Sequence, residues 1–306
     1  MNVNVIFKNT DNSEIVFDKI LSFSFRKDIY QSYTSFGAKI SGSLSEPENV
    51  SEILFTIDGK TIHHGLSDNI SVEISGGNSM ISVSSRSFTS LLIQNQIESG
   101  LKTDISINSL IKSYYNLPHV THEDSDEQSY IYVKSNSNMW DGIVNLSYKI
   151  HGTYPYIRGT NCIRMTPVEN PDLFEYDDSN IISRGISTAE SKLISHFHMS
   201  NLGGKFGEYE LSDEDIISHN IVRHRFFELD NQFLYNPQQA LEYRSAYSSR
   251  GIKKVFCKYI GYNGEDLSDT VTFGTINNMR IGFLNITGNN SGIITETGVY
   301  QDKFPM

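Results

Sequence analysis

The chain has 306 residues, of which 38% are hydrophobic and 11% aromatic, and its formal net charge is −11. This aromatic content excludes a disordered chain, and the negative charge argues against stable nucleic-acid binding because phosphate groups are repelled. No apolar run approaches the ~20 residues of a membrane-spanning helix, and the N-terminus lacks the basic and apolar segments of a signal peptide. We therefore expect a protein made in a cytoplasm, without a membrane span.

Residues 1–96 have the pattern of a small β-barrel domain. Asp58-Gly59 predicts a two-residue hairpin turn between strands at 55–57 and 60–62, because a type I′ turn needs positive φ at both central positions. A Gly-Gly-Asn turn is expected at 76–78. Alternating hydrophobic and polar residues, typical of half-buried strands, occur at 3–7, 15–17, 21–25, 37–44, 70–74 and 81–83.

Residues 97–170 have the pattern of a small α+β domain. A first helix is predicted within 101–114 from apolar residues at helical spacing, which are Ile107, Leu110, Ile111 and Tyr114. A second helix is predicted with Asn138 as its N-cap and Gly152 just beyond its end. A short strand is expected at 130–133, and a hairpin is expected across Gly159-Thr160.

Residues 171–306 have the pattern of a second β-barrel domain with an inserted helix. The helix is predicted to begin at Pro237 and to end before Gly251. Strands are predicted at 181–185, 191–200, 223–229, 254–260, 269–273, 279–287 and 292–300. Cys162 and Cys257 are expected to be free thiols. The predicted fold class is a β-rich α+β protein, in which two small β-barrel domains bracket a small α+β domain.

Nine histidines raise the question of a metal site. The candidate groups are His63–His64, His119–His122 with Glu123 and Asp124, His196–His198, and His219–His224. Zinc needs three or four ligands and a supporting shell, and no neighbouring residue completes any of these groups. The acidic loop at 119–127 lacks the spaced aspartates and the glycine of a calcium loop. We assign no metal ligand and no cofactor, although metal binding by the histidine or acidic clusters stays open.

The sequence contains no signature of an enzyme active site. Gly-x-Ser-x-Gly, His-Glu-x-x-His, a P-loop and a dinucleotide fingerprint are all absent. The carboxylates at 208–215 form one polar run, which indicates a solvated face and not a pair of acids in a cleft. Trp140 is expected in the core of the middle domain, and the arginines at 223, 225, 244 and 250 are expected at the surface or at a subunit interface. We assign no catalytic residue.

One motif between residues 53 and 96 resembles the baseplate hub proteins of contractile phage tails, of the phage Mu and T-even type, and of phage-tail-like bacteriocins. The matching residues are Ile57, Gly59, Ile62, Gly65, Ile70, Ile81, Val83, Arg86, Ser87, Leu91 and Leu92. Ser85 stands where the family usually has a glycine before the arginine. A weaker similarity covers the helix at 237–249, the strand at 252–260 and the final hairpin.

The resemblance implies a structural hub that is not an enzyme. Such a hub forms a homotrimer and adapts the six-fold tail tube to the three-fold central spike, with the tube protein, the spike protein and other baseplate proteins as partners. It would be made in the bacterial cytoplasm and assembled into a virion tail or a bacteriocin baseplate. Two alternatives stay open: a receptor- or cell-wall-binding tail protein, and a peptidoglycan-degrading accessory protein.

Overall fold

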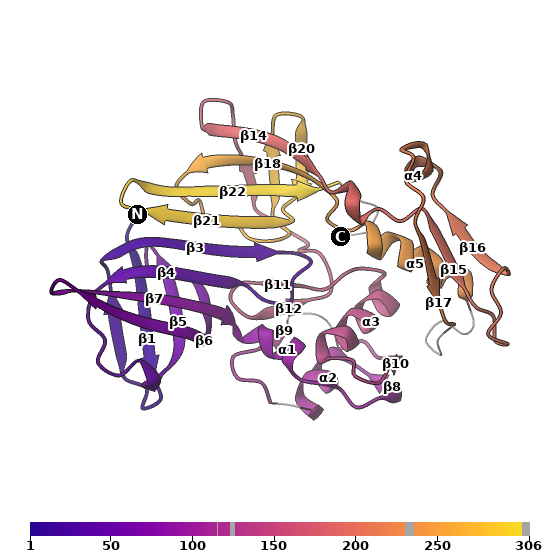
Figure 1. Ribbon diagram of the computed structural model, residues 1–306, viewed down its shortest axis with the longest axis horizontal. Helices are drawn as coiled ribbons and strands as arrows, with labels where there is room; N and C mark the ends of the chain where they lie inside the picture. Colours follow the sequence, from indigo (N-terminus) through magenta and orange to yellow (C-terminus); the bar gives the residue numbers. More distant parts are fainter. Residues whose placement is uncertain (115, 123–125, 230–235, 302–306) are drawn as a thin grey trace.

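The computed structural model is β-rich, and it describes residues 1–114, 116–122, 126–229 and 236–301. Its largest feature is a curled antiparallel sheet of eleven strands (Figure 1). The strand order is β14 (Ile181–Thr188), β18 (Lys253–Ile260), β22 (Gly292–Tyr300), β21 (Phe283–Asn289), β3 (Ile20–Asp28), β4 (Ser35–Ser41), β7 (Asn78–Ser87), β6 (Lys60–Ser75), β5 (Val50–Ile57), β1 (Val3–Asn9) and β2 (Glu14–Phe17). The expected β-rich α+β class is therefore confirmed.

The two β-rich ends of the chain form one sheet because β21 pairs with β3 from Phe283↔Asp28 to Asn289↔Ser22. Gly288 lies opposite Phe23, and a Cβ on Gly288 would stand 2.2 Å from the Phe23 ring. A side chain at this position would therefore displace a core phenyl ring. The strands of the two expected barrels thus belong to one continuous sheet.

Two hydrophobic cores lie along this sheet. The first is enclosed by the curled N-terminal strands and includes Phe7, Phe25 and Phe55, together with Leu284 and Ile286 from β21. The second lies beneath the C-terminal strands. It is covered by a smaller sheet of β13 (Leu173–Glu175), β19 (Thr270–Phe273) and β20 (Ile276–Arg280). Strand β21 contributes residues to both cores and so couples them.

The middle region packs as helices and short strands beneath the large sheet (Figure 1). Its elements are η2 (Phe88–Ser90), α1 (Leu91–Gln94), β8 (Gly100–Ile105), α2 (Ile107–Tyr114), β9 (Thr121–His122), β10 (Ser129–Val133), α3 (Met139–His151), β11 (Tyr156–Arg158) and β12 (Cys162–Arg164). Asn138 and Asp141 form a capping box at α3, and Gly152 ends it with φ of 70°. Trp140 is 5% exposed in this core, as predicted.

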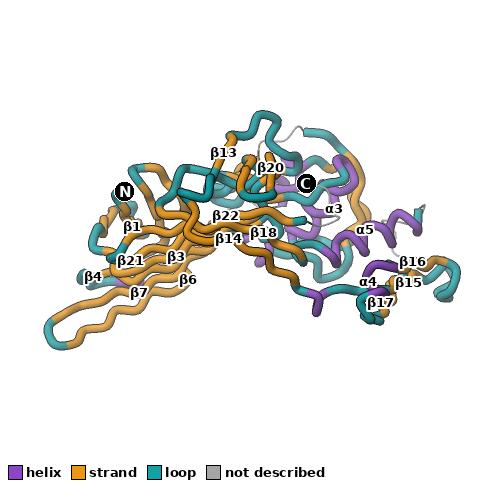
Figure 2. Tube along the Cα trace, turned by 90° about the horizontal axis from the view of Figure 1, so that it is seen from above, coloured by secondary structure: helices purple, strands orange, loops and turns teal. Residues whose placement is uncertain are grey.

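A third group of elements projects at one end of the molecule (Figures 1 and 2). It contains β15 (His196–Met199), β16 (Tyr209–Ser212), β17 (His224–Phe227), α4 (Glu214–Ser218) and α5 (Pro237–Ser249). Phe197, Met199 and Leu241 belong to the same hydrophobic core as α3. Residues from the predicted third domain therefore pack on the predicted middle domain. The boundaries at 96/97 and 170/171 stay predictions.

Several local predictions differ from the structure. Residues 101–105, which the sequence placed inside a helix, belong to strand β8 (Gly100–Ile105). Two strands expected at 60–62 and 70–74 are one strand, β6, with a bulge between Ser67 and Asn69. The strand expected at 279–287 is divided between β20 and β21, with Ile281 and Gly282 between them. The remaining short elements are η1 (Pro47–Asn49) and η3 (Glu190–Lys192). None of the helices in the described ranges is long and apolar enough to cross a membrane.

Gly65 allows β6 and β7 to approach closely. A Cβ on Gly65 would lie 2.2 Å from the backbone oxygen of Arg86 and 2.8 Å from the buried imidazole of His63. Neither the backbone nor a buried ring can move away without repacking. This steric limit explains why a glycine occupies this position of the motif.

We expect Gly65→Ala to lower the free energy of unfolding by about 2 kcal/mol or more, because overpacking a core forces backbone shifts. Gly37→Ala on β4 is the matched control, since its Cβ would meet atoms no closer than 3.5 Å. The control should stay within about 1 kcal/mol of wild type. Denaturant unfolding measures both, and equal stabilities of the two variants would contradict the close-approach argument.

Candidate functional site

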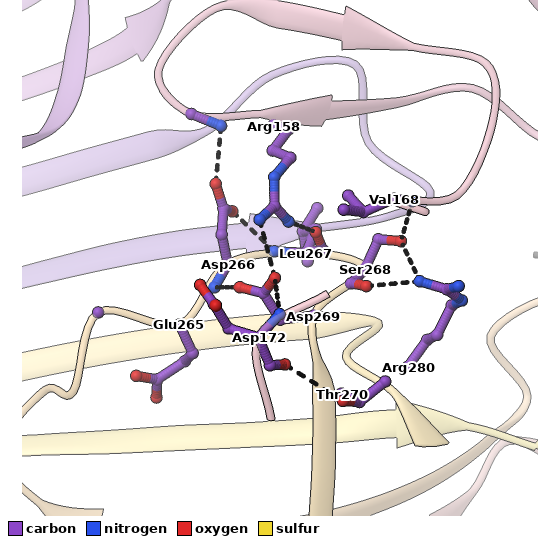
Figure 3. Close-up of polar contacts among 12 residues, drawn as sticks. Arg158, Val168, Asp172, Glu265, Asp266, Leu267, Ser268, Asp269, Thr270 and Arg280 are labelled. Atoms are coloured by element: carbon purple, nitrogen blue, oxygen red, sulfur yellow. Dashed lines mark hydrogen bonds and ion pairs between the residues drawn. The ribbon is translucent and has the colours of Figure 1, made fainter. Parts of the chain in front are cut away.

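A buried polar junction joins three distant parts of the chain (Figure 3). Lys27 Nζ on β3 donates to the Gly159 carbonyl oxygen at 2.7 Å and forms an ion pair with Asp266. The second oxygen of Asp266 accepts from the Gly159 backbone N–H at 2.7 Å. One carboxylate therefore fastens β3 and the β11–β12 turn to the loop before β19.

A second ion pair completes the junction. Arg158 Nη2 lies 2.8 Å from Asp269 Oδ1, and Asp269 is 1% exposed. Arg280 Nη1 donates to the carbonyl oxygen of Ser268 at 2.8 Å, and the Ser268 hydroxyl accepts from the Val168 N–H at 3.1 Å (Figure 3). These charged groups have their hydrogen-bond and ion-pair partners within the protein. We therefore interpret the junction as a structural contact between the three parts of the chain.

Burial and ion pairing together shift the pKa values of the two cations in this junction. Desolvation lowers the pKa of Lys27, and the charge and hydrogen bond of Asp266 act in the opposite direction. Desolvation lowers the pKa of Arg158, but the hydrogen bond that Arg158 donates to Asp269 and the charges of Asp266 and Asp269 outweigh it, so the pKa is raised overall. Removing either carboxylate would leave a buried cation without its partner, which costs more than the ion pair itself stabilises.

Glu265 lies next to the junction in a fully buried position. Its carboxylate accepts hydrogen bonds from the Tyr259 hydroxyl and from the Asn263 N–H at 3.1 Å. Desolvation raises the pKa of Glu265 to about 7, despite the hydrogen bonds that favour its charged form. Sequence reasoning did not identify this residue, because nothing local distinguishes it from the solvated acids of the chain.

His63 forms a hydrogen-bonded chain with Ser85 and Thr34 that resembles a nucleophile and its base. Its Nε2 lies 2.8 Å from Ser85 Oγ, and its Nδ1 lies 2.9 Å from Thr34 Oγ1. Desolvation lowers the pKa of His63 to about 3. All three residues are buried, and a hydroxyl stands where a base would need an orienting carboxylate. This arrangement stabilises the β4–β7 region and cannot reach a substrate.

The structure brings His64 and His119 together, although they belong to different sequence pairs. Their ring centroids are 4.5 Å apart, and Glu52 Oε2 lies 2.7 Å from His64 Nε2. Desolvation would raise the pKa of Glu52, but the His64 hydrogen bond and the nearby positive charges lower it overall. Desolvation also lowers the pKa of His64. His122 lies in β9 and is not part of this group, and residues 123–125 lie outside the described residues.

A second group of rings lies on the projecting three-stranded sheet. His198 Nε2 is 2.9 Å from His224 Nδ1, and His198 Nδ1 is 2.9 Å from Glu210 Oε1. The rings of His198 and Phe226 are stacked at 4.5 Å. His196 and His198 thus share a strand face, as expected, and His224 joins them from β17. His219 is only the C-cap of α4.

The remaining candidate residues have structural roles. Asp213 caps α4 by accepting from the Ile216 N–H at 3.3 Å, and Glu208 contacts Asn201. Arg223 donates to the backbone oxygens of Glu190 and Leu193. The other three arginines also contact their own chain: Arg225 the backbone of β17, Arg244 the ring of Phe227, and Arg250 the ring of Tyr247. The assignment of no catalytic, cofactor or metal residue stays a prediction.

The exposed surface of the large sheet contains apolar residues at its two ends. Ile182 and Ile186 on β14 are 52% and 67% exposed, and Ile74 near the tip of the long β6–β7 hairpin is 78% exposed (Figure 2). Ile182, Ile260 and Ile294 also line a shallow groove of about 270 Å³ between the ends of β14, β18 and β22. Isolated exposed isoleucines are ordinary, but their concentration around the β14 end of the sheet marks a surface suited to contact another chain.

Comparison with known proteins identifies the fold but not a family. Neither the protein-family models nor the curated proteins give a match. A tail protein from Neisseria meningitidis MC58 is similar over 99% of this chain and 98% of its own, at 13% identity and a TM-score of 0.74. The 43 kDa tail protein of prophage MuSo2 from Shewanella oneidensis is similar over 97% and 98%, at 12% identity and a TM-score of 0.73.

A third similar structure is a component of the Escherichia coli type VI secretion system. It is described as structurally similar to the phage T4 tail proteins gp27 and gp5. The similarity covers 94% of this chain and 76% of the other, at 8% identity and a TM-score of 0.56. At these identities the three comparisons establish a shared fold.

Glu265 predicts a pH dependence of stability. Its pKa is about 7 in the folded protein, above the ordinary value, so the folded state retains a proton that the unfolded state releases above pH ~4.5. The stabilising contribution of protonated Glu265 is complete below that pH. It is lost as the pH rises through about 7, which lowers the free energy of unfolding by about 3 kcal/mol.

Glu265→Gln retains the shape of the protonated side chain and should remove this slope between pH 4.5 and 7. Glu14→Gln, at an exposed position on β2, is the control and should retain the wild-type profile. Denaturant unfolding as a function of pH provides the measurement. An unchanged slope in Glu265→Gln would show that this carboxyl does not titrate in the interval.

Proposed function

We propose that this chain is a structural component of a contractile tail baseplate, the hub that adapts the six-fold tail tube to the three-fold spike. The observation that carries the proposal is the similarity in fold, over nearly the whole of both chains, to the Neisseria meningitidis tail protein and to the MuSo2 prophage tail protein. The motif at 57–92 points to the same family independently of the structure. The proposed role requires stable surfaces for assembly and no catalytic group.

The large sheet supports this role because it has two strand edges available for another copy. Strand β5 pairs with β6 only from Lys60 to Leu66, so residues 67–75 of β6 pair with β7 alone. At the other end, β14 pairs only with β18 among the strands of the described residues. Eight strands, from β14 to the outer half of β6, therefore lie between two free edges.

We propose that the β14 edge of one copy meets the β6 edge of the next. Two different edges that meet head to tail generate a ring when the rotation closes, and three copies give the homotrimer. Each copy contributes the two β-rich halves of its sheet, which we propose as the two barrel-like units that match a six-fold tube above. The spike protein would seat on the three-fold face below, with other baseplate proteins around the ring.

The outward face of these eight strands supports a passage that does not bind nucleic acid stably. Small side chains dominate its central rows, including Ser22, Ser24, Gly37, Ser82 and Ser84. Two of its cations are paired: Arg86 with Asp68 at 2.7 Å, and Lys258 with Glu296 at 3.0 Å. Short polar side chains, and the pairing of these two cations, reduce the attraction of this face for a phosphate backbone.

Ile186→Glu should weaken the trimer, because it places a charge at the proposed contact edge of β14. We expect the main species in analytical ultracentrifugation to shift from trimer to monomer, with an increase in the dissociation constant of about tenfold or more. Val16→Glu on β2 is the matched control, since Val16 is 60% exposed but lies at the opposite end of the sheet.

The control should sediment like wild type, and far-UV circular dichroism should be the same for all three proteins. A wild-type chain that stays monomeric at every concentration, alone and with its spike protein, would contradict the hub proposal. Dissociation of Val16→Glu but not of Ile186→Glu would place the contact at β2 and contradict the proposed pairing of the β14 and β6 edges.

A receptor- or cell-wall-binding role is the second candidate, because rings are exposed on the projecting sheet. Phe226 is 60% exposed and Phe206 is 46% exposed, with ring centroids 5.3 Å apart. The Phe206 ring stands at 89° to the Phe226 ring, and His198 stacks on Phe226, so the group exposes aromatic rings of the kind on which sugars can pack. A peptidoglycan-degrading accessory role would use the same surface. Among the described residues, however, we identify no two carboxylates placed to act as a catalytic pair.

Phe226→Ala tests this second candidate. If the surface binds glycans, pull-down on purified cell walls should retain the wild-type chain and lose most of the variant, because a stacked ring contributes about 1 kcal/mol or more. Ile260→Ala, at a 76% exposed position on the large sheet, should behave like wild type. Absence of cell-wall retention in the wild-type chain would remove the candidate.

A further inference from the structure

Three potential metal ligands lie close together at the surface: Glu52, His64 and His119. Glu52 on β5 and His64 on β6 are diagonal neighbours, since the register pairs Glu52 with Leu66 and Leu54 with His64. His119 reaches them from the loop after α2, and its Nε2 lies 3.6 Å from Glu52 Oε1. One donor atom from each of the three residues lies within 4.8 Å of the others.

The surroundings hold these side chains in place. Phe88 is buried, and its ring centroid lies 5.1 Å from that of His64 and 4.6 Å from that of His119, so it supports both imidazoles. Lys8 Nζ lies 3.5 Å from Glu52 Oε1 and orients the carboxylate. Ligand side chains supported by a second layer of contacts are the usual construction of a metal site.

The backbone at His119 adds an independent feature. Its φ is 60°, in the left-handed region that residues other than glycine adopt uncommonly, with asparagine, aspartate and histidine the most frequent among them. This conformation costs about 1 kcal/mol and projects the imidazole toward the sheet. Backbone strain in a non-glycine residue is often found where a side chain must be aimed at a ligand.

We propose that Glu52, His64 and His119 bind a divalent transition-metal ion of the zinc type. Two imidazole nitrogens and one carboxylate oxygen are a ligand set that zinc accepts in tetrahedral sites, with the fourth position left for water. Calcium and magnesium prefer oxygen ligands and are disfavoured by the two histidines. Ligand atoms around zinc lie roughly 3.4 Å from one another, so the 2.7 Å contact between His64 and Glu52 would open slightly and the 40% exposed His119 side chain would adjust to both.

The bound ion would join two parts of the molecule. Glu52 and His64 belong to the large sheet, whereas His119 precedes β9, which pairs with β12 in the middle region. The backbone oxygen of His64 already accepts from Asn161 Nδ2 at 3.0 Å, close to the same contact. The ion would therefore act as a structural clamp that fixes the loop at residues 116–120 on the N-terminal strands. This proposal does not depend on the hub function.

The test is a titration of the full, tag-free chain with Zn²⁺ by isothermal calorimetry after treatment with a chelator. We expect one site per chain that His119→Asn and Glu52→Gln each weaken by about tenfold or more. Asparagine tolerates the left-handed conformation and so removes the imidazole without disturbing the loop. Thermal unfolding gives a second readout, because Zn²⁺ should raise the Tm of the wild type but not of either variant.

His224→Asn is the matched control, since it removes an imidazole from the other histidine group and leaves the proposed site intact. This variant should bind Zn²⁺ at residues 52, 64 and 119 with the wild-type affinity. Equal affinities of the wild type, His119→Asn and Glu52→Gln would overturn the proposal. Loss of Zn²⁺ binding in His224→Asn alone would also overturn the proposal, because it would assign the metal to the projecting sheet.

Discussion

The pairing of β3 with β21 is the constraint on which the rest of the structure depends. These strands are more than 250 residues apart in the chain and align over the seven residues of β21. The pairing turns two sets of hairpins into one sheet and lets Leu284 and Ile286 complete the N-terminal core. Without it the two β-rich halves would have separate edges, and no run of eight strands would connect β14 to β6.

The polar junction secures this pairing from the side. Lys27 belongs to β3 itself, and its partner Asp266 lies in the loop that leads to β19. Arg158 adds the middle region through Asp269. Buried ion pairs contribute little net stability compared with apolar packing, but a misplaced buried charge is costly. The junction therefore favours one arrangement of the three parts, which suits a protein whose proposed task is to hold fixed positions in a larger assembly.

The sequence predicted features with a local physical signal. Asp58-Gly59 set the β5–β6 turn, Asn138 and Gly152 bounded α3, and Pro237 began α5. Features that depend on distant residues were not predictable, because a strand carries no local mark of its partner 250 residues away. For the same reason the sequence did not predict the junction around Lys27. Nor did it predict that Glu52 would lie beside His64 and His119. Alternation also failed at 60–75, where a bulge lets one strand continue through a polar stretch that looks like a loop.

The proposed hub requires that the eight-stranded runs of three copies join edge to edge into a closed ring. Electron microscopy of the purified chain, mixed with its spike protein, tests this most directly through two-dimensional particle averages. The account predicts three-fold rings with a central opening and a mass three times the chain mass of 34.6 kDa, excluding the spike. Particles that contain a single copy, or open chains of copies that do not close, would contradict it.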